Sequence, residues 1–234
     1  TFTDRGEREV TLRPEMTPTV ARLIAGAAAR RELTFPVRWY SIPNLFRYER
    51  MQRGRLREHW QLNCDIFGGD AVAADVEIIA LAHQILVNYG AAPEMFEIKV
   101  NSRSFFKEIF EEIGWSEEDA TAWMRHWDKY GKLPEGEWKR IYKEEIVGNR
   151  MSPEIFFGGI QNESPLGNEV VDSKPGIKKE AEKLESIIYS LQELGIDTKL
   201  DISLARGFDY YTGTIFEIFD TAPENNRSLL GGGR

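Results

Sequence analysis

The sequence has few of the residues that build disulfide frameworks or metal centres. It contains one cysteine, Cys64, and three histidines among 234 residues. A single cysteine excludes an internal disulfide and a cysteine-cluster metal site. The histidines are scattered rather than set at the spacing of a zinc motif. We therefore interpret all three as structural, and we expect no metal site among them: His59, His83 and His126.

Long hydrophobic runs are also missing. The longest aliphatic stretch, around Ile78–Val87, is interrupted by His83 and Gln84, so we expect no membrane span. Apolar residues make up 41% and charged residues 29%, which is ordinary for a globular protein and excludes intrinsic disorder. The chain begins at Thr1 without a signal-peptide pattern and ends in Gly231–Arg234. We expect a cytoplasmic protein, and a fragment cut from a longer one.

Positive charge is in deficit, because 30 Lys and Arg face 38 Asp and Glu, a net charge of −8. That balance excludes a protein that coats nucleic acid with its whole surface. Arginine nevertheless clusters in one stretch of the chain, and arginine binds phosphate with two parallel hydrogen bonds. The cluster either binds a polyanion or is a solvated hairpin tip paired with Glu49 and Glu58. Its members are Arg47, Arg50, Arg53, Arg55 and Arg57.

Alternation of residue types predicts two strands, Val37–Arg50 and Leu56–Phe67, joined by a turn that contains Gly54. One face of the second strand is apolar and is expected to pack: Leu56, Trp60, Leu62, Cys64 and Ile66. The other face either lines a pocket or meets solvent: Arg57, His59, Gln61, Asn63 and Asp65.

A helix is predicted from Thr17, its N-cap, to about Arg31, and another over Ile177–Leu191. Asp70 is predicted to cap a third helix, which Gly90 ends. Between residues 102 and 197 short charged helices replace strands, and tryptophans Trp123, Trp127 and Trp138 are expected to form a small core. Strands resume at Lys199–Arg206 and Thr214–Phe219. We therefore predict an α+β fold in which one sheet is interrupted by a helical insertion.

Several polar residues are candidates for a ligand site. Arg206 ends an apolar strand face, so it needs either a carboxylate partner or a ligand phosphate. Glu15, Gln61 and Asp65 are acceptors that either hold an ammonium group or act as caps and surface residues. The pair Tyr210–Tyr211 either stacks on a planar ligand or packs in the core.

Taken together, these residues resemble the histidyl-tRNA synthetases. Residues 12–17 (LRPEMT) resemble the family's amino-acid-binding signature, and Phe46–Arg50 with Arg53–Gln61 resemble motif 2 of class II synthetases. Leu204–Thr214 resembles the histidine-specific peptide, and Gly231–Arg234 the glycine-rich strand that comes after it. The motifs stand in the family's order and cover essentially the whole chain.

The resemblance implies a class II fold, a mixed and mostly antiparallel sheet with flanking helices. It implies a catalytic core in two parts, residues 1–101 and 198–234, around a helical insertion domain, residues 102–197. Motif 1, motif 3 and the anticodon-binding domain are not in the sequence, so we expect an incomplete catalytic core. Met16 stands where glycine is common, and Asp65 is one methylene shorter than the glutamate of many bacterial members.

The resemblance also implies residue roles. Glu15, Met16 and Thr17 would hold the ammonium side of the substrate histidine, and Gln61 and Asp65 would contact the bound histidine. Arg47 and Arg206 would act at the α-phosphate of ATP, while Arg55 would reach the β- and γ-phosphates. Tyr210 and Tyr211 would line the imidazole pocket.

The resemblance implies a ligase that joins histidine to tRNA(His) through histidyl-adenylate. It implies ATP as a substrate and Mg²⁺ as a cofactor. The full-length protein would be a cytoplasmic homodimer. The alternative is a non-catalytic paralogue, such as the regulatory subunit of ATP phosphoribosyltransferase. The intact peptide Arg206–Thr214 and the presence of Glu15 and Arg47 disfavour that alternative. A class II synthetase for another amino acid is the second alternative.

Overall fold

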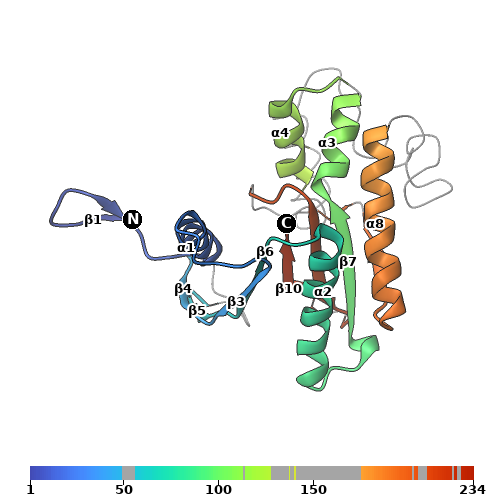
Figure 1. The fold of residues 1–234 in the computed structure, drawn as a ribbon, viewed down its shortest axis with the longest axis horizontal. Coiled ribbons are helices and arrows are strands. Elements are labelled where there is room, and N and C mark those ends of the chain that lie inside the picture. Colours follow the sequence, from blue (N-terminus) through green and yellow to red (C-terminus); the bar gives the residue numbers. More distant parts are fainter. Residues whose placement is uncertain are drawn as a thin grey trace. The chain divides into compact units, whose positions relative to one another are not determined.

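The computed structural model describes residues 1–48, 56–112, 114–127 (for 125–127 the backbone alone), 137, 140, 175–201, 203–204, 210–222, 224–225 and 228–234. The chain divides into two compact units, Thr1–Ala74 and Asp75–Arg234. Figure 1 shows the elements of both units.

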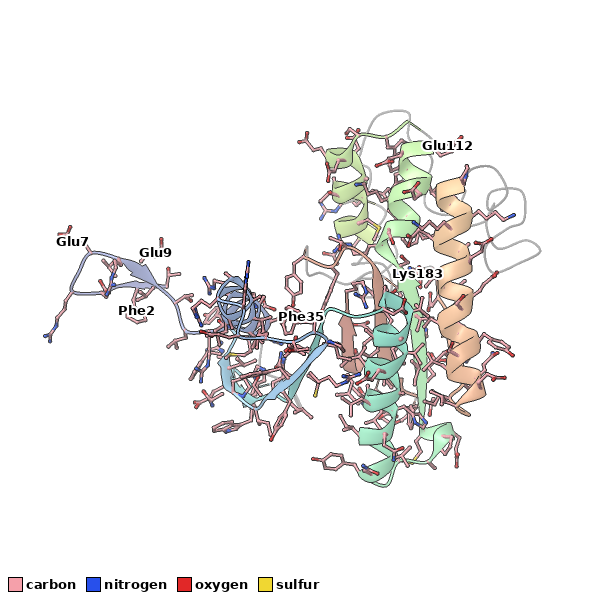
Figure 2. All side chains as sticks on the ribbon, viewed as in Figure 1. Phe2, Glu7, Glu9, Phe35, Glu112 and Lys183 are labelled. Carbon is pink, nitrogen blue, oxygen red and sulfur yellow. The ribbon has the colours of Figure 1, made fainter. Side chains whose placement is uncertain are left out.

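The first unit opens with a short hairpin of β1 (Phe2–Thr3) and β2 (Glu9–Val10), which pair antiparallel. Figure 2 shows its side chains, with Glu7 and Glu9 labelled. Helix α1 (Thr17–Ala29) comes next and buries Val20 and Ile24. Its N-cap is Met16 rather than the predicted Thr17, because the Met16 carbonyl accepts the amides of both Thr19 and Val20.

The predicted hairpin is present, but each of its strands is interrupted. β3 (Val37–Ser41) pairs with β6 (Asn63–Phe67), and β4 (Asn44–Phe46) pairs with β5 (Glu58–Trp60), both antiparallel. Proline has no N–H to offer a ladder, and Pro43 stands at the first interruption. The Pro43 carbonyl accepts a hydrogen bond from the Gln61 amide at 3.1 Å, and Gln61 lies at the interruption of the other strand, between β5 and β6.

The apolar face predicted for the second strand is wrong for three of its members. Leu56, Trp60 and Leu62 are 60%, 71% and 46% exposed. The break after Trp60 ends the two-residue alternation on which the prediction rested. The buried residue at this place is Leu45 of β4, which is opposite His59 and 0% exposed.

Helix α2 (Ala71–Asn88) runs from the end of the first unit into the second. As predicted, Asp70 caps it, because its Oδ1 accepts the Ala73 amide at 2.9 Å. Gly90 lies just beyond it at φ +92. By length and composition alone α2 is apolar enough to cross a membrane, with a mean hydropathy of 1.4. Core helices pass the same test, but only 17% of this window is buried, so the expectation of no membrane span stays a prediction.

The second unit is built on a four-stranded sheet, ordered β10-β9-β7-β8. The strands are β7 (Phe96–Ser102), β8 (Thr198–Leu200), β9 (Thr214–Asp220) and β10 (Ser228–Gly233). Only β8 is parallel to its neighbour, so this sheet is mixed and mostly antiparallel, as predicted. A single 3₁₀ turn, η1 (Pro93–Met95), precedes β7.

Strand β8 is shorter than the predicted strand Lys199–Arg206. The chain turns after Leu200 because Asp201 accepts hydrogen bonds from two residues on its C-terminal side. Its carbonyl takes the Leu204 amide at 3.0 Å, and its carboxylate takes the Ser203 amide at 2.9 Å. Arg206 itself lies outside the described residues.

Three helices lie between β7 and β8 in the described sequence: α3 (Arg103–Glu112), α4 (Glu117–Trp127) and α8 (Pro175–Glu193). Helix α8 contacts both β7 and α3, and Figure 1 shows it running beside β7. Figure 2 labels Glu112 at the end of α3 and Lys183 on α8.

An aromatic core joins α3 to α4. Trp123 is 1% exposed and lies within 5.2 Å of Phe110, ring centre to ring centre, while Phe110 stacks on Trp115 at 5.0 Å. The prediction that Trp123 packs is therefore confirmed. Trp127 and Trp138 fall outside the described side chains. The domain boundaries at 102 and 197 stay a prediction.

Candidate functional site

The segment Leu12–Thr17 is fastened along β4. The Phe46 amide donates to the Arg13 carbonyl at 2.9 Å, and the Arg13 Nε donates to the Asn44 carbonyl at 2.7 Å. Beyond this segment α1 begins and buries its apolar side. The loop that carries Glu15, Met16 and Thr17, all half-buried, is therefore held between a strand and a helix.

Arg47 comes directly after β4 and ties three segments together. Its Nε donates to the Pro14 carbonyl at 2.8 Å, and its Nη2 donates to Gln61 Oε1 at 3.0 Å. Its backbone amide donates to the Arg57 carbonyl at 2.8 Å. A guanidinium is a planar fork with five N–H donors. Within the described part of the chain two of them fix its plane, so it is preorganised to offer the rest to an anion.

The polar face of the second predicted strand is linked to Arg47 through Gln61. Gln61 Nε2 donates to Asn63 Oδ1 at 2.8 Å. Across the β3–β6 pair, Asn63 is opposite Ser41 and Asp65 is opposite Trp39, so alternate residues of both strands share this face. Gln61, Asn63 and Asp65 are all half-buried. Cys64 and Ile66 on the opposite face are half-buried as well, and Arg57 of the polar face is exposed. Whether the polar face lines a pocket or meets solvent therefore stays a prediction.

Asp65 ends this row with a carboxylate oxygen that lacks a partner. Its Oδ2 is buried and accepts no hydrogen bond in the described structure, and the same holds for the Ser41 Oγ. Burial raises the pKa of Asp65 above its ordinary value, because the charged form loses hydration. Such an acceptor is suited to an N–H group brought by a ligand.

The neighbouring Cys64 is not a nucleophile. Burial, and then the charge of Asp65, raise the pKa of its thiol. A thiol with a raised pKa stays protonated near neutral pH and is unreactive. The described side chains also contain no group of three or more His, Cys, Asp or Glu residues arranged to hold a metal ion.

The arginine cluster is described only at its two ends. Arg57 places its guanidinium carbon 4.5 Å from the ring centre of Tyr48, which is a cation–π distance. Tyr48 is 92% exposed. Arg50, Arg53 and Arg55 lie outside the described residues.

The second unit holds the tyrosine pair. The rings of Tyr210 and Tyr211 lie 4.7 Å apart, centre to centre, at 58°. Arg234 closes the segment behind them, because its carbonyl accepts the amides of Thr212 at 2.7 Å and Gly213 at 3.1 Å. A Cβ on Gly233 would lie 2.8 Å from Tyr211 Cδ1, so only glycine admits this ring.

Arg234 is in turn anchored to α2. Its Nε and Nη2 both donate to Asp75 Oδ1, at 3.0 Å and 2.9 Å. Asp75 is 6% exposed, and a buried carboxylate of this kind needs a cation beside it. The glycine-rich strand is therefore fixed at its end, and with it the backbone next to Tyr211.

The predicted site residues thus fall into two groups. In the first unit Arg47 binds the Pro14 carbonyl and Gln61, and Gln61 binds Asn63. Glu15, Met16 and Thr17 follow Pro14 in the chain, and Asp65 lies on β6, which pairs with β3. The second unit holds Tyr210 and Tyr211. Sequence reasoning missed two groups beside these residues: Ser41, which is opposite Asn63, and the Pro14 carbonyl, which binds Arg47. Asn63 was visible as part of the polar alternation, whereas Ser41 and the Pro14 carbonyl depend on pairing and backbone direction that no sequence pattern encodes.

Residues 1–234 match the family model described as histidyl-tRNA synthetase. A curated histidine–tRNA ligase from Leptospira biflexa is 41% identical over 240 residues, which cover 100% of this chain and 53% of that protein. A second curated histidine–tRNA ligase, from Thermoplasma volcanium, is 38% identical over 238 residues, which cover 100% of this chain and 53% of that protein. The chain therefore spans about half the length of these curated relatives.

Solved structures share the fold. The histidyl-tRNA synthetase from Nostoc sp. PCC 7120 superposes with a TM-score of 0.73 at 22% identity, covering 94% of this chain and 52% of that one. An ATP phosphoribosyltransferase regulatory subunit/histidyl-tRNA synthetase from Bacillus halodurans C superposes with a TM-score of 0.74 at 20% identity. The match covers 100% of this chain and 60% of that one. The fold alone does not separate the two functions that these structures' names give. The chain belongs to the histidyl-tRNA synthetase family.

Proposed function

We propose that this chain is the catalytic part of a class II histidine–tRNA ligase, which activates histidine with ATP and transfers it to tRNA(His). The observation that carries the proposal is the framework around Arg47, which links the Pro14 carbonyl, Gln61 and Asn63. It joins the loop expected to bind the amino acid to the strand expected to bind ATP. Family membership supports the same reading.

Adenylation needs positioning and charge stabilisation more than acid–base chemistry. The histidine carboxylate attacks the α-phosphorus in line, and pyrophosphate leaves with the bonding electrons. Negative charge builds on the α-phosphate oxygens in the transition state. In the proposal Arg47 and Arg206 stabilise that charge, and Arg55 binds the β- and γ-phosphates.

Two of the arginine assignments rest on the sequence motif alone, because Arg55 and Arg206 lie outside the described residues. For Arg47 the structure adds a physical argument. A guanidinium already fixed by two hydrogen bonds loses little side-chain entropy when it binds a phosphate or carboxylate. We assign it to both the α-phosphate and the substrate carboxylate.

The amino acid would be read by hydrogen bonds. In the proposal Glu15, Met16 and Thr17 hold the ammonium group, and Gln61 and Asp65 contact the bound histidine. The buried, unpartnered Oδ2 of Asp65 supports this role. Tyr210 and Tyr211 line the imidazole pocket. A pocket built on hydrogen bonds rejects analogues that lack the matching group, because its buried polar atoms are then left unpaired.

The remaining parts of the proposal come from family membership. Mg²⁺ would arrive with ATP and be held chiefly by its phosphates and water, as this cation prefers. The full-length protein would be a cytoplasmic homodimer. Size-exclusion chromatography with light scattering on that protein tests the dimer, and a monomer at micromolar concentration would contradict it.

Amino-acid specificity is tested by a thermal-shift panel on the full-length protein with ATP and each amino acid in turn. A ligand that binds only the folded state at 100 times its Kd stabilises by about 2.7 kcal/mol. We expect histidine to give the largest shift, and preferential stabilisation by another amino acid would favour a different class II synthetase. Absence of histidine-dependent ATP–pyrophosphate exchange, together with binding to a biosynthetic enzyme, would favour the regulatory paralogue.

A further inference from the structure

Arg47, Gln61 and Asn63 form a hydrogen-bonded chain in which each amide can point only one way. A guanidinium has donors and no acceptor, so the Gln61 atom that faces Arg47 Nη2 at 3.0 Å is the acceptor Oε1. The other end of that amide is therefore Nε2, which donates to Asn63 Oδ1 at 2.8 Å. The far end of the Asn63 amide is in turn Nδ2, which carries two N–H donors. Arg47 thus determines, through Gln61, that Asn63 ends the chain with a donor.

The Nδ2 of Asn63 donates to no group among the residues that the structure describes. Ser41 is its neighbour across the β3–β6 pair, and the Ser41 Oγ is itself without a partner there. Asn63 is half-buried, and unlike the Ser41 Oγ its Nδ2 is not a fully buried atom. A donor that is fixed in direction, unpartnered and accessible is available to a ligand.

Asp65 offers the opposite chemistry on the same face of β6. It is two residues beyond Asn63, so the two Cα atoms lie about 6.6–6.8 Å apart and both side chains project from one face of the strand. An ionised carboxylate has acceptors only, and the Asp65 Oδ2 accepts no hydrogen bond from the described residues. One donor and one acceptor, both without a partner, therefore lie next to each other on β6.

This donor–acceptor pair discriminates among the polar groups of a histidine molecule. An ammonium group has only donors and would leave the Asn63 N–H groups unpaired, while a carboxylate has only acceptors and would meet Asp65 with like charge. The neutral imidazole ring has one of each, an N–H and an unprotonated nitrogen. Polar groups left unpaired in a binding site cost free energy, so the neutral ring is the part of the molecule that satisfies both residues.

We propose that Asn63 is a substrate-binding residue that selects the neutral imidazole ring of histidine: its Nδ2 donates to the unprotonated ring nitrogen, while Asp65 accepts the ring N–H. This role rests on the proposed function, because it takes histidine as the substrate. It adds a binding residue that the sequence motif does not assign, and it specifies the protonation state in which the ring binds. Arg47 gains a second role, since it fixes the direction of the Gln61 and Asn63 amides.

The experiment measures the dissociation constant of histidine by isothermal titration calorimetry on the full-length protein, from pH 5.5 to 8.5 and well below the Tm of each variant. Asn63→Asp keeps an acceptor for Gln61 but presents a carboxylate oxygen to the ligand in place of the N–H donor. Asn63→Ala removes both groups. Asn88→Asp is the matched control, because Asn88 Oδ1 likewise accepts a glutamine, Gln84 Nε2 at 2.9 Å, at the exposed end of α2.

We expect the wild type to bind histidine about 10-fold more weakly at pH 5.5 than at pH 8, because a ring with a pKa of about 6.5 is mostly protonated at the lower pH. Asn88→Asp should follow the same curve. Asn63→Asp should reverse it and bind at least about 3-fold more tightly at pH 6 than at pH 8, because imidazolium brings two N–H donors to two carboxylates. Asn63→Ala should weaken binding about 10-fold at pH 8, with less than about 3-fold change in the KM for ATP.

A curve for Asn63→Asp that keeps the wild-type direction, or wild-type affinity in Asn63→Ala at pH 8, would overturn the role of Asn63. Either variant decides alone, so one that fails to fold leaves the other as the test. The titratable groups on the elements that pack together here are the same in every variant and cannot produce the reversal: Asp65 and Cys64 on β6, Arg38 and Tyr40 on β3, and Arg22 on α1. No histidine binding by the wild type at any pH would instead overturn the proposed function, so the two failures are distinguishable.

Discussion

Replacing Asp65 by asparagine should make the protein more stable and bind histidine less well. Asp65 Oδ2 is buried without a hydrogen-bond partner in the described structure, and such an orphaned acceptor costs about 1–3 kcal/mol. Asparagine keeps the shape and removes the charge, but it leaves an amide that also wants partners. We therefore expect a net gain below that cost, about 0.5–1 kcal/mol, or a Tm rise of about 1–4 °C.

The raised pKa of Asp65 also makes the stability of the wild-type protein depend on pH. Burial raises the pKa of Asp65 in the folded state, so between the unfolded and folded pKa values the folded state binds more protons. Stability then falls as pH rises through that interval. The Tm difference between Asp65→Asn and wild type should therefore grow as pH rises from about 4 towards 7, and should shrink as pH falls towards the unfolded pKa of about 3.9.

The assay is thermal unfolding of the full-length protein from pH 4 to 7, with and without histidine. Glu185→Gln on the exposed face of α8 is the matched control for loss of one carboxylate, and its Tm should not change with this pH profile. Histidine should bind the Asp65 variant about 10- to 100-fold more weakly, the loss of one charge-assisted hydrogen bond. A variant less stable than wild type at pH 7, or one that binds histidine equally well, would refute the reasoning.

Three further predictions address the other parts of the molecule. Arg206→Ala should abolish ATP–pyrophosphate exchange with only a modest fall in Tm, and retained activity would remove Arg206 from the site. Gly233→Ala should raise the KM for histidine and cost about 1–3 kcal/mol of stability, because its Cβ would lie 2.8 Å from Tyr211; an unchanged KM with this stability loss would contradict the pocket role. Hydrogen bonds from Lys199 and Lys99 lower the pKa of Glu97. Burial raises the pKa of Asp201, but hydrogen bonds from Ser203 and Lys99 outweigh that effect, so its pKa is lowered as well. Their stabilisation is present above the unfolded pKa values and is lost as pH falls below about 4, so the urea midpoint should drop there, and a midpoint that stays level would contradict the ion-pair account.

The sequence predicts the elements of this fold better than their ends. Helix α2, with its Asp70 cap, and helix α8 were predictable because capping and helical periodicity are local. Strand ends were not, because they depend on tertiary hydrogen bonds. Strand β8 stops early since Asp201 accepts the Leu204 amide, and the predicted hairpin strands are interrupted where Gln61 bonds to Pro43.

The site divides in the same way. Arg47 and Gln61 were visible as residue types in a motif, but the bond between them at 3.0 Å is a product of strand pairing. The alternation that marked Asp65 could not say whether its face meets solvent, since burial is decided by what packs there. The buried hydrogen bond from the Asn101 side chain to the Leu204 carbonyl carried no sequence signal, because the two residues are 103 positions apart.

The measurement that tests the central claim most directly is ATP–pyrophosphate exchange by the full-length protein, with and without histidine. The account predicts exchange that requires histidine, that other amino acids do not support, and that Arg47→Ala lowers at least 100-fold, the loss of a charge-stabilising donor worth about 2.7–4 kcal/mol. Exchange without dependence on histidine, or full exchange by Arg47→Ala, would contradict the claim that this framework activates histidine.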